Sequence, residues 1–141
     1  MLSNKVRLVA AFGFAIALAA GFSLSASPAM ASAKQCMDGS GIAGGECTYI
    51  NGNGNVIDYM QGVFVNAGYI TEYNIHIELV YPDGALIKNC KQVNVLAGTE
   101  TPVCQWSPDH SENPGEYCSR AWEELSSNNY KMVAKACVGV A

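Results

Sequence analysis

Two histidines hold most of the acid–base chemistry that this 141-residue chain could perform. His76 lies between Glu72 and Glu78 in an alternating segment, and even-numbered side chains of a β-strand share one face. An imidazole beside carboxylates titrates near neutral pH or shares a metal ion with them. A row of alternating charges is equally typical of a solvated sheet face. Glu72, His76 and Glu78 are therefore candidate binding residues.

The second histidine lies in a polar segment, residues 107–116, that contains three carboxylates. Such a loop could hold Ca²⁺, or it could place a histidine beside Ser111 for hydrolysis. Its spacing matches no calcium-binding loop, and its prolines and charges are typical of any exposed connection. Loops of β-sandwiches often carry binding residues, and the candidates here are Asp109, His110, Glu112 and Glu116.

Metal binding by thiolates is disfavoured, because no two cysteines form a Cys-x-x-Cys pair. The oxygen-rich residues 51–58 contain a single carboxylate, Asp58, and are better explained by a hairpin turn. The sequence therefore predicts no metal ion, no cofactor and no assigned catalytic residue.

The cysteines predict three disulfide bonds, since an even number of cysteines in a small exported protein is typical of a disulfide framework. A hairpin turning at Gly98 would join Cys90 to Cys104, which leaves Cys36 to pair with Cys47. The six residues concerned are Cys36, Cys47, Cys90, Cys104, Cys118 and Cys137.

The third bridge is placed by the register of a terminal hairpin over residues 117–140. If Leu125 faces Tyr130 across its turn, Cys118 faces Cys137. Side chains directly opposite one another in an antiparallel pair are close enough for a disulfide. The sequence therefore predicts a bridge between Cys118 and Cys137.

The elements that would carry these residues are β-strands, because side chains alternate in polarity from Glu46 onward and turn residues recur regularly. The clearest strand covers residues 69–81, with odd-numbered side chains buried and even-numbered ones facing solvent. Residues 51–55 predict a hairpin turn and Gly62 a β-bulge. We predict an all-β fold, a two-layer antiparallel β-sandwich of Ig-like or Greek-key type with about six to seven strands, stapled by three disulfides.

Residues 1–31 have the features of a secretory signal peptide, with Lys5 and Arg7 ahead of an apolar stretch and a small-residue site ending at Ala31. Cleavage after Ala31 would leave residues 32–141 as a single domain with 6 basic and 12 acidic side chains. This balance argues against a nucleic acid partner, and no later segment is apolar enough to cross a membrane. We therefore expect a secreted, extracellular protein.

The terminal hairpin, framed by Cys118, Trp122, Tyr130 and Cys137, resembles the tail of small uncharacterised disulfide-containing secreted proteins of actinobacteria. The resemblance covers about the last quarter of the chain. It implies no activity, and no functional residue is carried over from it.

Aromatic composition favours a binding function. The 7 tyrosines and 2 tryptophans suit recognition surfaces, because each ring adds apolar area and a polar group. Trp106 and Trp122 share strand parity with a half-cystine, so each packs over a disulfide or forms an exposed platform. We expect an extracellular protein or cell-surface ligand as the partner, in an inhibitory, adhesive or antagonistic role. The alternatives are a small secreted hydrolase using His110 or His76, and a carbohydrate-binding module.

Overall fold

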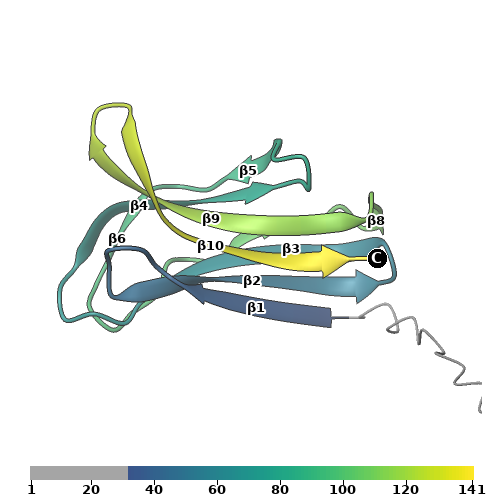
Figure 1. The fold of residues 1–141 in the computed structure, drawn as a ribbon, viewed down its shortest axis with the longest axis horizontal. Helices are drawn as coiled ribbons and strands as arrows, with labels where there is room; N and C mark the ends of the chain where they lie inside the picture. The colour runs from purple at the N-terminus through teal and green to yellow at the C-terminus, as the bar shows by residue number, and fades with distance from the viewer. Residues whose placement is uncertain (1–31) are drawn as a thin grey trace, which may run out of the picture.

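The computed structural model describes residues 32–141, and the predicted signal peptide lies outside the described residues. Every regular element in the described range is a β-strand (Figure 1). In chain order the strands are β1 Ser32–Asp38, β2 Gly44–Asn53, β3 Val56–Asn66, β4 Glu72–Val80, β5 Leu86–Asn89, β6 Val93–Val95, β7 Cys104–Trp106, β8 His110–Ser111, β9 Gly115–Ser126 and β10 Asn129–Val140. No helix long and apolar enough to cross a membrane occurs between residues 32 and 141.

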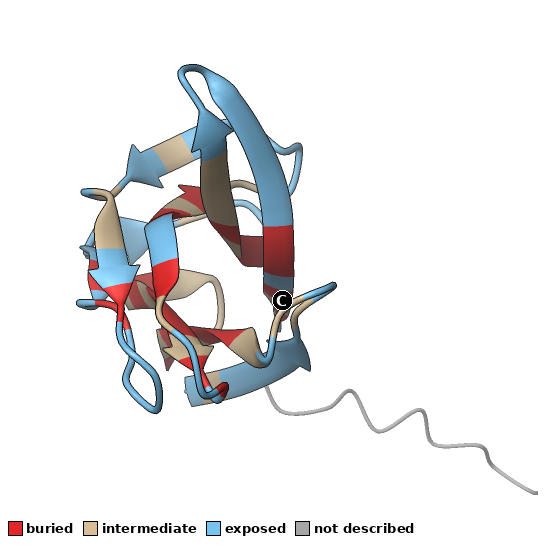
Figure 2. Ribbon diagram, turned by 90° about the vertical axis from the view of Figure 1, so that its left-hand side faces the viewer, coloured by how far each residue is buried: buried red, intermediate tan, exposed pale blue. Residues whose placement is uncertain are grey.

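The strands form two antiparallel sheets, which confirms the predicted two-layer sandwich. The first sheet has the order β1-β2-β3-β7 with β8 also on β3, and the second has the order β10-β9-β4-β5 with β6 also on β4. Ten strands replace the expected six or seven, because β5 to β8 are short pieces of two to four residues. Figure 2 shows the buried segments in red where the sheets face each other. The core residues there include Ile57, Met60, Phe64, Ile75, Ile77, Leu79 and Ala121.

β4 keeps the predicted alternation in its second half only. Its buried odd-numbered residues are Ile75, Ile77 and Leu79. The predicted burial of Tyr69 and Tyr73 is wrong, since their exposed fractions are 101% and 59%. The reason is an irregularity between Glu72 and Ile75, where Asn74 has a φ of 57° and the pairing with β6 shifts register.

The three predicted disulfide pairings are confirmed. Cys36–Cys47 and Cys118–Cys137 each join directly opposite residues of a hairpin. The predicted hairpin around Gly98 is wrong, although Gly98 has the expected positive φ of 71°. β6 pairs with β4 and β7 pairs with β3, so Cys90–Cys104 connects the two sheets. Cys104 and the last residue of β6 are both buried in the core.

Gly62 does not form the predicted bulge. Its register opposite Thr48 is continuous, and the shift in the β2–β3 ladder lies between Asn51 and Gly52. A Cβ atom at Gly62 would lie 2.7 Å from the Cβ of Ser119 and 2.8 Å from Cγ2 of Ile77. The missing side chain therefore lets the second sheet approach the first closely.

The β9–β10 hairpin extends beyond the sandwich (Figure 1). Its register around Cys118 and Cys137 is as predicted, but an extra residue in β10 between Met132 and Ala134 shifts the pairing beyond it. Tyr130 consequently faces Glu124 instead of the predicted Leu125.

Candidate functional site: a cleft on the outer face of the second sheet

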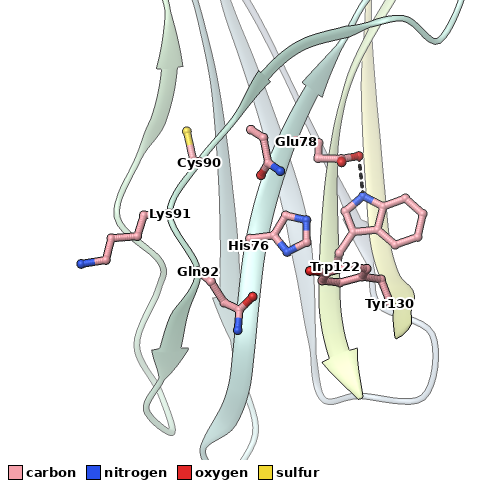
Figure 3. A pocket seen from close by; sticks show the side chains of 8 residues that line it. His76, Glu78, Cys90, Lys91, Gln92, Trp122 and Tyr130 are labelled. Carbon is pink, nitrogen blue, oxygen red and sulfur yellow. Dashed lines mark hydrogen bonds between the residues drawn. The ribbon is translucent and has the colours of Figure 1, made fainter. Parts of the chain in front are cut away.

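The outer face of the second sheet carries a cleft of about 550 Å³. Its floor is β4, one wall is the β9–β10 hairpin, and the other wall is the connection between β5 and β6 (Figure 3). The lining residues are His76, Glu78, Asn89, Cys90, Lys91, Gln92, Trp122 and Tyr130. The volume lies within the range of roughly 300–1,000 Å³ typical of ligand pockets.

Strand alternation and one bulge bring the aromatic and acidic side chains together. Because Ile77 faces the core, its neighbours His76 and Glu78 face outward. Trp122 lies directly opposite His76 in the β4–β9 ladder. The register shift in β10 carries Tyr130 onto the same side, where its ring stands edge-on to His76 with 5.3 Å between centroids.

The two carboxylates near the floor accept hydrogen bonds from neutral groups. The Trp122 indole N–H donates to Glu78 Oε2 at 2.7 Å (Figure 3). The Gln92 side-chain amide donates to Glu124 Oε2 at 3.0 Å, and the Asn128 backbone N–H donates to its other oxygen at 3.3 Å. Within residues 32–141 neither carboxylate has an ion-pair partner.

His76 is almost enclosed by this cluster, with only 7% of its surface exposed. Burial lowers its pKa below the ordinary 6.5, an effect that the Glu78 and Glu124 carboxylates partly oppose. The imidazole is therefore neutral at pH 7, with one nitrogen as donor and the other as acceptor. Neither nitrogen hydrogen-bonds to another described residue. The expectation that His76 faces solvent is wrong, because Trp122 and Tyr130 cover it.

Basic side chains near the cleft are directed elsewhere. The Lys91 ammonium points away from His76 (Figure 3). Arg120 is the cross-strand partner of Glu78, yet its Nη2 lies 3.6 Å from where a Cβ at Gly84 would be, in the β4–β5 turn. Neither Lys91 nor Arg120 therefore forms an ion pair with the carboxylate on the floor of the cleft among the described residues.

Glu72 lies outside the cleft. The irregularity at Asn74 separates it from His76 along β4, and Glu72 is mostly buried opposite Val95 of β6. The predicted row of Glu72, His76 and Glu78 is thus reduced to its last two members.

In the predicted loop site, His110 contacts two acceptors that belong to the loop itself. His110 Nε2 lies 2.9 Å from Glu112 Oε1, and its Nδ1 lies 2.6 Å from the Pro108 carbonyl oxygen. Both ring nitrogens face acceptors, which leaves neither free to deprotonate a nucleophile. Asp109 has a positive φ of 53°, and Glu116 pairs with Gly139 at the start of the terminal hairpin. In the part of the chain that the structure describes, no three His, Cys, Asp or Glu side chains are placed to share a metal ion.

Sequence reasoning missed the walls of the cleft. Asn89 and Gln92 flank Cys90, and their position depends on the bridge from Cys90 to the other sheet. The sequence identifies Tyr130 only as part of the terminal hairpin. The available signal was Trp122 four residues from a half-cystine, and it did not indicate which face the ring occupies.

The interior contains another residue that the sequence did not single out, Glu46 of β2. It is fully buried, and neither carboxyl oxygen makes a hydrogen bond to a described residue. Burial raises its pKa to about 8, and the nearby Ser119 side chain and Val63 backbone offset this only in part. The hydroxyl of Ser119 is itself 2.6 Å from that of Thr48, which donates to the Ala136 carbonyl. Glu46 is therefore protonated at neutral pH and lies outside the cleft lining.

Trp106 packs against other aromatic rings next to the core. Its ring stacks on Tyr117 at 6.5 Å between centroids and meets Tyr81 edge-on at 5.6 Å. Of the two tryptophans, Trp122 alone lines the cleft.

Comparison of the chain with protein-family models, with curated protein sequences and with solved structures finds no match.

Proposed function

We propose that this protein is an extracellular binding protein that recognises a protein partner through the cleft of His76, Glu78, Trp122 and Tyr130. The observation that carries the proposal is an aromatic-walled cleft whose floor holds a buried histidine without a hydrogen-bond partner. Tryptophan and tyrosine are the side chains that most often dominate binding energy at protein interfaces.

Secretion supports this proposal. The first 31 residues read as a signal peptide, and three disulfides are typical of an oxidising compartment. The partner would then be met outside the cell, as a secreted or surface-exposed protein.

A carbohydrate ligand is the second candidate. Side-chain amides of Asn89 and Gln92 face aromatic rings across the cleft, and such groups suit sugar hydroxyls and sugar faces. The hydrolase alternative has less support. Among the described residues that line the cleft there is no serine, no threonine and no free thiol to act as a nucleophile.

The test is capture with purified residues 32–141 from the extracellular and surface proteins of the source organism. We expect one protein to bind the wild type and the His110→Ala variant and not the Tyr130→Ser variant. Circular dichroism confirms that each variant is folded. Binding of the purified partner that is unchanged in Tyr130→Ser would overturn the proposal. Retention on polysaccharide alone would favour the carbohydrate alternative.

A further inference from the structure

We propose that the cleft takes up the guanidinium group of an arginine side chain presented by the partner. This inference rests on the proposed function, because it names the chemistry that a binding cleft at this position recognises.

Charge is the first reason. Glu78 lines the cleft, and Glu124 accepts a hydrogen bond from the lining residue Gln92, so both carboxylates lie at the cleft. Each accepts hydrogen bonds only from neutral donors. Lys91 lines the cleft with its ammonium pointing away from His76, and the Arg120 guanidinium lies by the β4–β5 turn. A cationic ligand group supplies the countercharge that the described residues do not provide.

His76 is the second and independent reason. It is more than nine-tenths buried, lines the cleft and hydrogen-bonds to no described residue. In its neutral form it offers an acceptor nitrogen toward the ligand, and the amide oxygens of Asn89 and Gln92 are further acceptors on the wall. A guanidinium group carries five N–H donors in one plane and can address several acceptors together, which the compact ammonium of lysine does less well.

The aromatic wall is the third reason. Trp122 and Tyr130 stand beside the floor carboxylate, and aromatic faces attract a guanidinium group by cation–π interaction and stacking. The indole ring is held in place by its hydrogen bond to Glu78. Beyond the cleft, residues 32–141 carry 12 acidic and 6 basic side chains, a balance that speeds encounter with a basic segment.

The test uses the Trp122 indole N–H as a reporter in ¹⁵N–¹H correlation spectra of residues 32–141. The chain has two tryptophans, so the indole region contains two signals, and Trp106, which packs against the core outside the cleft, serves as the internal reference. The probes are N-acetyl-arginine methylamide, its neutral isostere N-acetyl-citrulline methylamide, and N-acetyl-lysine methylamide. We expect a saturable shift of the Trp122 signal with the arginine probe and about tenfold or greater weakening with each of the other two.

Variants then assign the effect to the cleft. Glu78→Gln keeps an acceptor for the Trp122 indole and removes the charge, so it should weaken the arginine probe by about tenfold while the protein stays folded. Glu124→Gln checks the second carboxylate, and His110→Ala should leave the titration unchanged. An equal response to citrulline or lysine overturns the inference, as does a response to oligosaccharides alone.

Failure of this inference is separable from failure of the proposed function. If no basic probe moves the Trp122 signal while Tyr130→Ser still abolishes partner capture, arginine recognition is wrong and the binding cleft stands. If partner capture is also insensitive to Tyr130→Ser, both are wrong.

Discussion

Glu46 and Glu78 belong to facing sheets of the same sandwich, and both are withdrawn from bulk water to some degree. Glu46 points from β2 into the interior, is fully buried and makes no hydrogen bond to a described residue. Glu78 points outward from β4, is partly exposed, and accepts the Trp122 indole N–H at the floor of a cleft. A proton satisfies Glu46, whereas Glu78 keeps its charge available to a ligand. Burial of a carboxyl group shifts its pKa, whereas access to a cavity decides whether the group can contact a ligand.

The largest expected effect is on stability, from Glu46→Gln. The folded protein keeps a proton on Glu46 up to about pH 8, while the unfolded chain loses it near pH 4.5. Its contribution to the free energy of unfolding therefore falls as pH rises between these values, by about 4–5 kcal/mol. Glutamine mimics the protonated acid and should remove this slope without changing cleft binding. Denaturant titrations at pH 5 and 8.5 give the change of the unfolding free energy with pH. An equal change in the wild type and in Glu46→Gln would contradict the role given to Glu46.

Removing the bridge between the sheets comes next. Replacing Cys90 and Cys104 by serine should cost about 3 kcal/mol of stability and also weaken cleft binding, because Cys90 fixes the wall that carries Gln92. Serine at Cys36 and Cys47 is the matched control. It removes a bridge of similar span from the other sheet and should leave the cleft intact. Thermal unfolding and the Trp122 titration together distinguish the two double variants. An equal loss of binding in both would contradict the specific role of Cys90–Cys104 in holding the cleft wall.

Trp122→Ala should weaken binding and leave the pH dependence of stability unchanged, whereas Glu46→Gln should do the reverse. Loss of the ring removes a wall and the donor to Glu78, which should weaken partner binding by about 30-fold or more. The pH slope of stability, which belongs to the interior, should be unchanged. Calorimetry of partner binding and unfolding measurements at two pH values test these two expectations. If Trp122→Ala changed only the pH dependence of stability, the separation of the cleft from the interior would be contradicted.

His76 should give a smaller pH effect of opposite sign to that of Glu46. Its pKa is lower in the folded protein than in the unfolded chain, so its contribution to stability is complete above pH 6.5 and is lost as pH falls. Between pH 4.5 and 6.5 the two contributions oppose one another, so His76→Gln should steepen the fall of stability with rising pH, and Glu46→Gln should leave only the loss on acidification. Unfolding free energies measured from pH 4 to 9 check this, and an unchanged pH dependence in His76→Gln would be evidence against it.

The smallest effect is expected from His110→Ala. The imidazole is 64% exposed, and the Glu112 side chain that it contacts is 10% exposed. Pairs with an exposed member contribute about 1 kcal/mol, so stability should change by about this amount and cleft binding not at all. A clear loss of binding in this variant would move the recognition site to the loop.

Much of the fold was predictable because it depends on local spacing. The even number of cysteines and the register of the terminal hairpin predicted Cys118–Cys137. The buried face of β4 followed from alternation over Ile75, Ile77 and Leu79. Each of these depends on residues that are near one another in the chain or related by one hairpin.

The candidate site was predictable only in part. His76 and Glu78 were identified because two side chains on one strand face need no tertiary information. Tyr130 was misplaced because a single extra residue in β10 moves it to a different partner, and a one-residue shift leaves no mark on the composition. For the loop around His110, the sequence cannot show that both imidazole nitrogens find acceptors within the loop.

The sequence by itself determined the alternating strands, the pairing of Cys118 with Cys137 and the acidic balance, all of which follow from residue type and spacing. Tertiary structure decided that Cys90–Cys104 crosses between the sheets, that Glu46 is sealed in the interior, and that Trp122 and Tyr130 enclose His76. The physical reason is that these three outcomes depend on how one sheet packs on the other and on one bulge. Alternation within a strand specifies which residues share a face, and packing between sheets specifies what that face meets.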